Sequence, residues 1–153
     1  MSITLLIRDT KWRRLRGLGA RLKRAAGEAL VRGGGQATAA ITILLTSDRH
    51  MSALNLGFRG KDEPTNVLSF PSSMSAYLGD IAIAYGVTAK EAKNAGKSHI
   101  DHTTHLAVHG VLHLLGYDHA TARQAKIMEP LEIGVLKALN VADPYGREAA
   151  RRP

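Results

Sequence analysis

A long uninterrupted helix from Ser98 to Leu115 is the feature that most constrains how this chain can fold. That segment contains no proline and a single glycine, Gly110, and Gly116 follows it as a helix terminator. Ser98 with Asp101 resembles a capping box in which aspartate replaces the preferred glutamate or glutamine. We therefore expect a helix that begins at Ser98 and a chain that turns sharply at Gly116.

Three histidines in and after this helix are predicted to converge on one point. His109 and His113 are four residues apart, so they share a helix face with an axial separation of about 6 Å. His119 follows the glycine by three residues, and a chain that turns there can bring it back over the same face. His105 continues the stripe, but it lies about 12 Å from His113 along the axis. Bonds from zinc to nitrogen are only about 2.0–2.1 Å long, so one ion cannot readily bind both.

This ligand set predicts a site for one divalent metal ion, with Zn²⁺ as the expected ion. The chain has no cysteine, so imidazole, carboxylate or water must hold any metal. Three neutral imidazoles leave a fourth position open for water, which is typical of catalytic rather than structural zinc. A histidine pair at this spacing is weak evidence alone, but the pair, the glycine and the third histidine together are rare.

The spacing also parallels the H-E-x-x-H-x-x-G-x-x-H motif of metzincin proteases. The general-base glutamate of that motif falls on Gly110, which has no side chain. Peptide hydrolysis by that mechanism therefore loses its base, whereas metal-assisted hydrolysis of another ester stays open.

The rest of the chain alternates strand-like and helical patterns. The expected strands are Ser2–Arg8, Ala39–Thr46, Val67–Phe70 and Leu78–Ala84. The expected helices are Lys11–Arg32, Ser47–Gly57, Val87–Ala95, Ser98–Leu115 and Thr121–Leu139. The last of these helices is expected to be kinked or restarted at Pro130. Phe58–Asn66 is expected to be a loop. This order predicts a single-domain α/β (α+β) fold in which helices cover a mixed sheet of about four strands. The metal site would lie on the long helix and the turn after it.

Positive charge is concentrated at the two ends of the chain. Of the net charge of +8, residues 1–35 carry nine Lys or Arg against two Asp or Glu, and residues 147–153 carry three against one. The intervening residues carry nine against ten. This favours contact of the N-terminal segment, with its basic helix 11–32, with nucleic acid or the ribosome, and solubility is the alternative. The tail at 147–153 is expected to be solvated. We expect one domain at 1–146 followed by that basic tail.

Neither a membrane span nor a signal peptide is expected. No apolar run reaches about 18 residues, and the N-terminus lacks a basic start and a small-residue cleavage site. The expected compartment is therefore the cytoplasm.

The segment from His109 to His119 resembles the H-G-x-L-H-L-x-G-Y-D-H signature of the YbeY endoribonucleases, which are bacterial rRNA maturation factors. Residues 58–71 resemble the family's R-G-x-D-x-P-T-[DN]-V-L-S-F-P block, and residues 78–81 resemble its L-G-D-I strand. Met128 and Glu132 lie where the family's last helix carries Met and Glu. The resemblance covers about residues 40–139, and three blocks in this order are highly specific.

The resemblance implies a zinc-dependent endoribonuclease specific for single-stranded RNA, with one Zn²⁺ per chain held by His109, His113 and His119. It implies 16S rRNA 3′-end maturation, ribosome quality control and the small ribosomal subunit as a partner, without a nucleotide cofactor. It also implies Arg59 at the active site, with His113 as the other catalytic residue. A guanidinium suits this place because it offers two parallel donors to a phosphate; by position alone, Arg59 would be a surface loop residue.

Three further residues are candidates for supporting the metal ligands. His105 is expected either to hydrogen-bond near the site or to pack, and Asp118 either to orient an imidazole, to act as a base or to cap a turn. Asp80 is a weaker candidate, with a structural role at its strand as the alternative. The main rival function is a non-enzymatic RNA-binding ribosome assembly factor with a structural metal, and a metzincin-like protease is less favoured.

Overall fold

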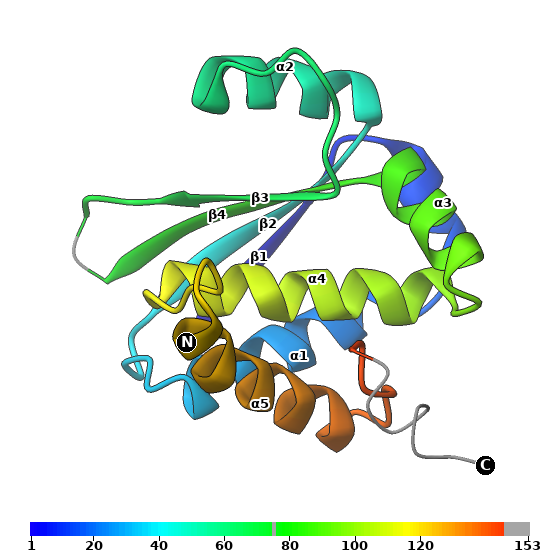
Figure 1. Ribbon diagram of the computed structural model, residues 1–153. Coiled ribbons are helices and arrows are strands. Elements are labelled where there is room, and N and C mark those ends of the chain that lie inside the picture. Colours follow the sequence, from blue (N-terminus) through cyan, green and yellow to red (C-terminus); the bar gives the residue numbers. More distant parts are fainter. Residues whose placement is uncertain (75, 146–153) are drawn as a thin grey trace.

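The computed structural model describes residues 1–74 and 76–145 as ten elements (Figure 1). In chain order these are β1 (Ser2–Ile7), the short 3₁₀ helix η1 (Thr10–Arg14), α1 (Leu18–Arg32), β2 (Ala40–Thr46), α2 (Asp48–Arg59), β3 (Val67–Pro71), β4 (Tyr77–Ala84), α3 (Tyr85–Asn94), α4 (His99–Leu114) and α5 (Ala122–Ala138). The expected tail at 147–153 lies outside the described residues.

The four strands form one mixed sheet in the order β1-β2-β4-β3, which confirms the predicted fold class. β1, β2 and β4 run parallel, and β3 is an antiparallel edge strand paired with β4. The inner strands β2 and β4 are rich in Ile, Leu and Ala. Their residues Ile41, Ile43, Ile81 and Ile83 are buried in the core that the sheet shares with α4. Helices α1 and α4 lie on one face of the sheet, with α5 packed against them on the side away from the sheet, and α2 lies over the other face (Figure 1).

Helix α4 lies directly against the sheet and is the centre of the core. Its N-cap Ser98 accepts a hydrogen bond from the backbone N–H of Asp101 at 3.0 Å, as the sequence predicts. Gly110 allows the close approach to β4, because a Cβ at that position would lie 2.9 Å from Cγ2 of Ile81. The helix ends at Leu114, and Gly116 takes a φ of 100° that favours glycine.

Three expected boundaries differ in the structure. The predicted helix Lys11–Arg32 is divided into η1 and α1, because Gly17 adopts a φ of 80° between them. Helix α2 continues to Arg59, so Phe58 and Arg59 are helical rather than part of a loop. Of the two alternatives expected at Pro130, a kink or a restart, the restart is wrong, because α5 continues through that residue. The proline ring and the carbonyl it leaves unpaired are accommodated on a solvent-exposed face of the helix.

Among the described residues, none of the helices combines the length and the apolar character that crossing a membrane requires.

Candidate metal centre

The structure brings the imidazoles of His109, His113 and His119 together. One ring nitrogen from each lies within 4.8 Å of the others, and Nε2 of His109 faces Nε2 of His113 at 3.0 Å. Two nitrogens bound to one tetrahedral zinc ion stand about 3.3 Å apart, which is close to the separation between His109 and His113. The donor set therefore fits a divalent metal, as the spacing in the sequence predicts.

Local backbone geometry explains how His119 reaches the other two. At the end of α4, the N–H of Gly116 bonds to the carbonyl of His113, and the N–H of Tyr117 bonds to that of Leu112, both at 3.0 Å. This pairing caps the helix and reverses the chain. The hydroxyl of Tyr117 donates to the carbonyl of Gly33 at 3.0 Å, which ties the turn to the end of α1.

A fully buried carboxylate supports this site from α5. Glu132 is 0% exposed and accepts three hydrogen bonds, from Nε2 of His105 at 2.8 Å, from Nδ1 of His109 at 3.2 Å and from the hydroxyl of Tyr145 at 2.8 Å. Burial by itself would raise the pKa of Glu132, but the hydrogen bonds from His105, His109 and Tyr145 and the charge of His109 outweigh it and lower the pKa to about 2.

The ionised carboxylate fixes the tautomer of His109. A carboxylate can only accept, so Nδ1 of His109 carries the proton and Nε2 keeps its lone pair toward His113. Burial, followed by the charges of His109 and His119, lowers the pKa of His113, which favours the neutral form that binds metals.

Glu132 was not predicted as a site residue, although a signal exists in the sequence. It stands four residues after Met128 and four before Leu136, and both of those side chains are fully buried. A carboxylate on the buried face of a helix requires a partner inside the protein.

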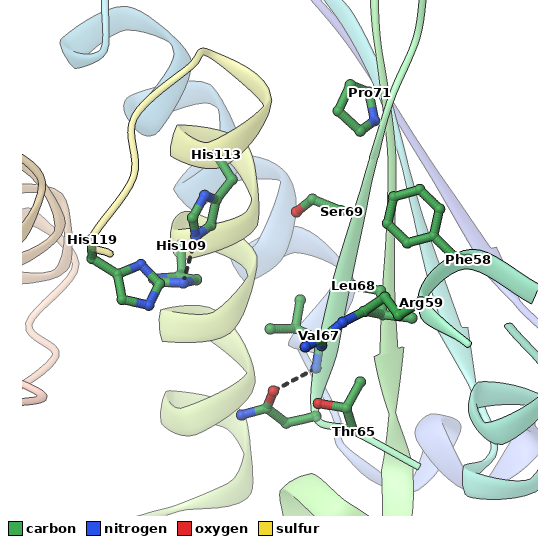
Figure 2. Close-up of a pocket in the computed structure, with 11 residues that line it drawn as sticks. Phe58, Arg59, Thr65, Val67, Leu68, Ser69, Pro71, His109, His113 and His119 are labelled. Carbon is green, nitrogen blue, oxygen red and sulfur yellow. Dashed lines mark hydrogen bonds between the residues drawn. The ribbon is translucent and has the colours of Figure 1, made fainter. Parts of the chain in front are cut away.

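A cleft of about 540 Å³ opens beside the histidines, between α4 and β3 (Figure 2). Arg59 is the last residue of α2, and its guanidinium extends into this cleft from the wall opposite the histidines (Figure 2). A hydrogen bond joins β3 to α4, because the hydroxyl of Ser69 donates to the carbonyl of Gly110 at 3.2 Å. The lining comprises Phe58, Arg59, Thr65, Asn66, Val67, Leu68, Ser69, Pro71, His109, His113 and His119.

The remaining predicted residues lie in different places. His105 contacts Glu132 rather than the point where the three imidazoles meet. Asp118 accepts from the backbone N–H of His119 at 2.7 Å and lies 3.9 Å from Nδ1 of the same residue, so it orders the turn. Asp80 lines a hollow on the face of the sheet that α2 covers and bonds to Tyr77, which places it across the sheet from the histidines.

Comparison with known proteins places the chain beside one named family. The family model described as Endoribonuclease YbeY matches residues 16–140. Endoribonuclease YbeY of Chelativorans sp. is 48% identical over 138 residues, which are 86% of this chain and 83% of that protein. The same-named protein of Methylocella silvestris is 50% identical over 113 residues, or 71% of this chain and 64% of that one.

A solved structure supports the fold alone. The solution structure of a Thermotoga maritima protein superposes with a TM-score of 0.58 at 22% identity, covering 99% of both chains. The family match covers most of the chain and is supported by relatives of almost 50% identity, and on these grounds the chain belongs to the YbeY endoribonuclease family.

Proposed function

We propose that this chain is a metal-dependent endoribonuclease that cleaves single-stranded RNA in the cleft between α4 and β3. The observation that carries the proposal is the convergence of three imidazoles on one wall of a cleft whose other wall carries Arg59. The names of the relatives, which describe endoribonucleases, support RNA as the substrate.

His109, His113 and His119 would hold the ion, which we propose to be Zn²⁺ at one per chain. When bound by three neutral ligands, such an ion supplies Lewis-acid chemistry, either by acidifying water or by stabilising charge on phosphate oxygens. Arg59 would bind the anionic phosphodiester opposite the histidines, because its guanidinium can donate two parallel hydrogen bonds. Glu132 would hold His109, His105 would hold Glu132, and Asp118 would order the turn that carries His119.

The proposal extends to a cellular role in 16S rRNA 3′-end maturation and ribosome quality control, with the small ribosomal subunit as partner and the cytoplasm as compartment. These finer assignments rest on the family resemblance. No nucleotide cofactor is part of the proposal.

The experiment pairs elemental analysis with cleavage of a single-stranded RNA. We expect about one zinc per wild-type chain, loss of both metal and cleavage in His109→Ala, and retention of both in the control His50→Gln, whose ring contacts Thr46 outside the cluster. Arg59→Glu should keep its metal and lose cleavage. Unchanged cleavage by Arg59→Glu would remove Arg59 from the reaction, and cleavage by metal-free protein would contradict the proposal as a whole.

The rival function, an assembly factor with a structural metal, finds less support. Structural zinc sites are closed by four protein ligands, and the described residues offer three here. Glu132 is not the fourth, because it contacts Nδ1 of His109, on the side of the ring that faces away from His113. Metal-loaded His113→Ala that still processed RNA would revive this rival.

A metzincin-like protease is disfavoured by packing as well as by sequence. The residue that would carry the general base is Gly110, and a side chain there would meet Ile81 of β4 rather than open space. Casein cleavage that a chelator blocks would be needed to restore that reading.

A further inference from the structure

A second charged feature lies outside the cleft, on η1, the turn after it and the first turns of α1. Lys11, Arg13, Arg14, Arg16, Lys23 and Arg24 are all exposed, and we call them the N-terminal basic surface. The segment from residue 8 to residue 24 carries eight Lys or Arg against one acidic residue. Most of the net charge of +8 is therefore concentrated in one short part of the chain.

This surface is built on an anchored backbone rather than on a frayed end. Trp12 is 1% exposed, and its indole N–H donates to the carbonyl of Thr46 at 2.9 Å. Its ring packs against Tyr85 and His99 with centroids 5.1 and 5.2 Å away. The side chain of Asp9 accepts from the N–H of Lys11 at 3.0 Å. Arginines on such a segment lose little backbone entropy when they bind.

The charges on this surface are not neutralised within the protein. Two neighbouring arginines have carboxylate partners, Arg21 with Asp101 at 3.2 Å and Arg32 with Glu28 at 3.1 Å. Within the described part of the chain, none of the six residues of the N-terminal basic surface has a carboxylate within 4.0 Å. An exposed set of unpaired cations attracts a polyanion.

The chemistry of the surface indicates phosphates rather than bases. Proteins that bind unpaired bases offer aromatic rings for stacking. Trp12, the aromatic residue of this segment, is buried against Tyr85 and His99. Cations without an exposed ring suit the sugar–phosphate backbone and would bind it without regard to base sequence.

The N-terminal basic surface is separate from the cleft. Trp12 contacts His99, the first residue of α4, and His109 follows ten residues later, which is about 15 Å along the helix axis. Helix α1 packs beside α4 (Figure 1). The cleft lies between α4 and β3, and β3 is the edge strand opposite β1. A nucleotide in the cleft cannot also touch η1.

We propose that the N-terminal basic surface binds the phosphate backbone of an RNA segment that lies outside the cleft, so that long RNA is held at two places. This inference rests on the proposed function for its choice of polyanion. The surface would add affinity for long RNA without taking part in cleavage.

The test compares two variants with the same loss of charge. Arg13→Gln/Arg14→Gln/Arg16→Gln removes three cations from the surface, and Lys90→Gln/Lys126→Gln/Lys137→Gln removes three exposed cations from α3 and α5. Binding of single-stranded RNA of about 40 nucleotides is measured by fluorescence anisotropy between about 50 and 200 mM salt. Thermal unfolding shows that both variants are folded.

We expect the arginine variant to bind long RNA at least tenfold more weakly, with a salt slope shallower by about 2, because each lost phosphate contact removes about 0.7 from the slope. The lysine control should keep a slope close to that of the wild type. The loss should be equal for poly(U) and poly(A), and the rate of cleavage of a trinucleotide should not change.

Equal slopes for the two variants would overturn the proposal, even if the cleft proves active. An effect confined to vesicles of anionic phospholipid, with RNA binding unchanged, would also overturn it. If the wild type fails to cleave RNA but the arginine variant alone loses RNA binding, the proposed function fails and the RNA-binding surface stands.

Discussion

Replacing Glu132 with Gln tests whether a buried carboxylate sets the metal affinity of this site. The substitution keeps the shape of a side chain that is 0% exposed, so it opens no cavity. It removes the charge and turns one acceptor oxygen into an NH₂ donor, while His105, His109 and Tyr145 all donate toward this carboxylate. At least one of these donors must then lose its partner or, for a histidine, change tautomer.

The loss in metal affinity follows from that rearrangement. If His109 moves its proton to Nε2, the lone pair that faces His113 at 3.0 Å is no longer free for a metal. Loss of a hydrogen-bond partner to a metal-binding histidine lowers metal affinity by about 10- to 100-fold. That range corresponds to about 1.4–2.7 kcal/mol.

Zinc affinity is measured by competition with a chelating indicator, and the ring tautomer of His109 by ¹⁵N NMR of the metal-free protein. Glu91→Gln is the matched control, because Glu91 of α3 accepts from Nε2 of His102 at 2.9 Å. His102 lies on α4, as His109 does, but is not one of the three converging histidines. We expect weaker zinc binding and a changed tautomer in Glu132→Gln alone. A folded Glu132→Gln protein with wild-type zinc affinity and Nδ1-protonated His109 would refute the reasoning.

Three further predictions concern stability. Gly110→Ala should lower the free energy of unfolding by about 1–3 kcal/mol, because its Cβ would meet the buried side chain of Ile81 at 2.9 Å. The control Gly57→Ala, whose Cβ would have no atom within 4 Å, should be neutral or stabilising. Equal melting temperatures for the two variants would contradict this prediction. Burial, followed by the charge of His102, lowers the pKa of His99, so below about pH 6.5 the unfolded chain binds a proton that the folded chain does not. The free energy of unfolding should therefore fall as pH drops below that value, and denaturant titrations should show a shallower fall in His99→Gln. Zinc at 100 times its Kd should stabilise the wild type by about 2.7 kcal/mol, and a chelator should reverse this; the same response in His113→Ala would place the stabilising ion elsewhere.

The convergence of His109, His113 and His119 could be predicted from the sequence because most of its geometry is local. The step from His109 to His113 is one helical turn, and Gly116 both ends the helix and allows the positive φ that returns His119. The pattern of strands and helices was likewise sufficient for a mixed sheet of four strands, because alternating elements of this length have few other ways to bury their apolar faces.

The contacts that support the centre were decided by packing between distant segments. Glu132 meets His109 across 23 residues. Arg59 reaches the cleft because the end of α2 packs on β3, where Phe58 contacts Phe70. Gly17 divides the predicted helix, and Trp12 on its N-terminal side packs against Tyr85 of α3 and His99 of α4. The periodicity of apolar residues within residues 11–32 cannot reveal these contacts with distant segments. Local sequence thus determined which groups could bind a metal, since helix and turn geometry extend over a few residues. Only the tertiary structure decided what holds and faces those groups, because that depends on how remote apolar surfaces fit together.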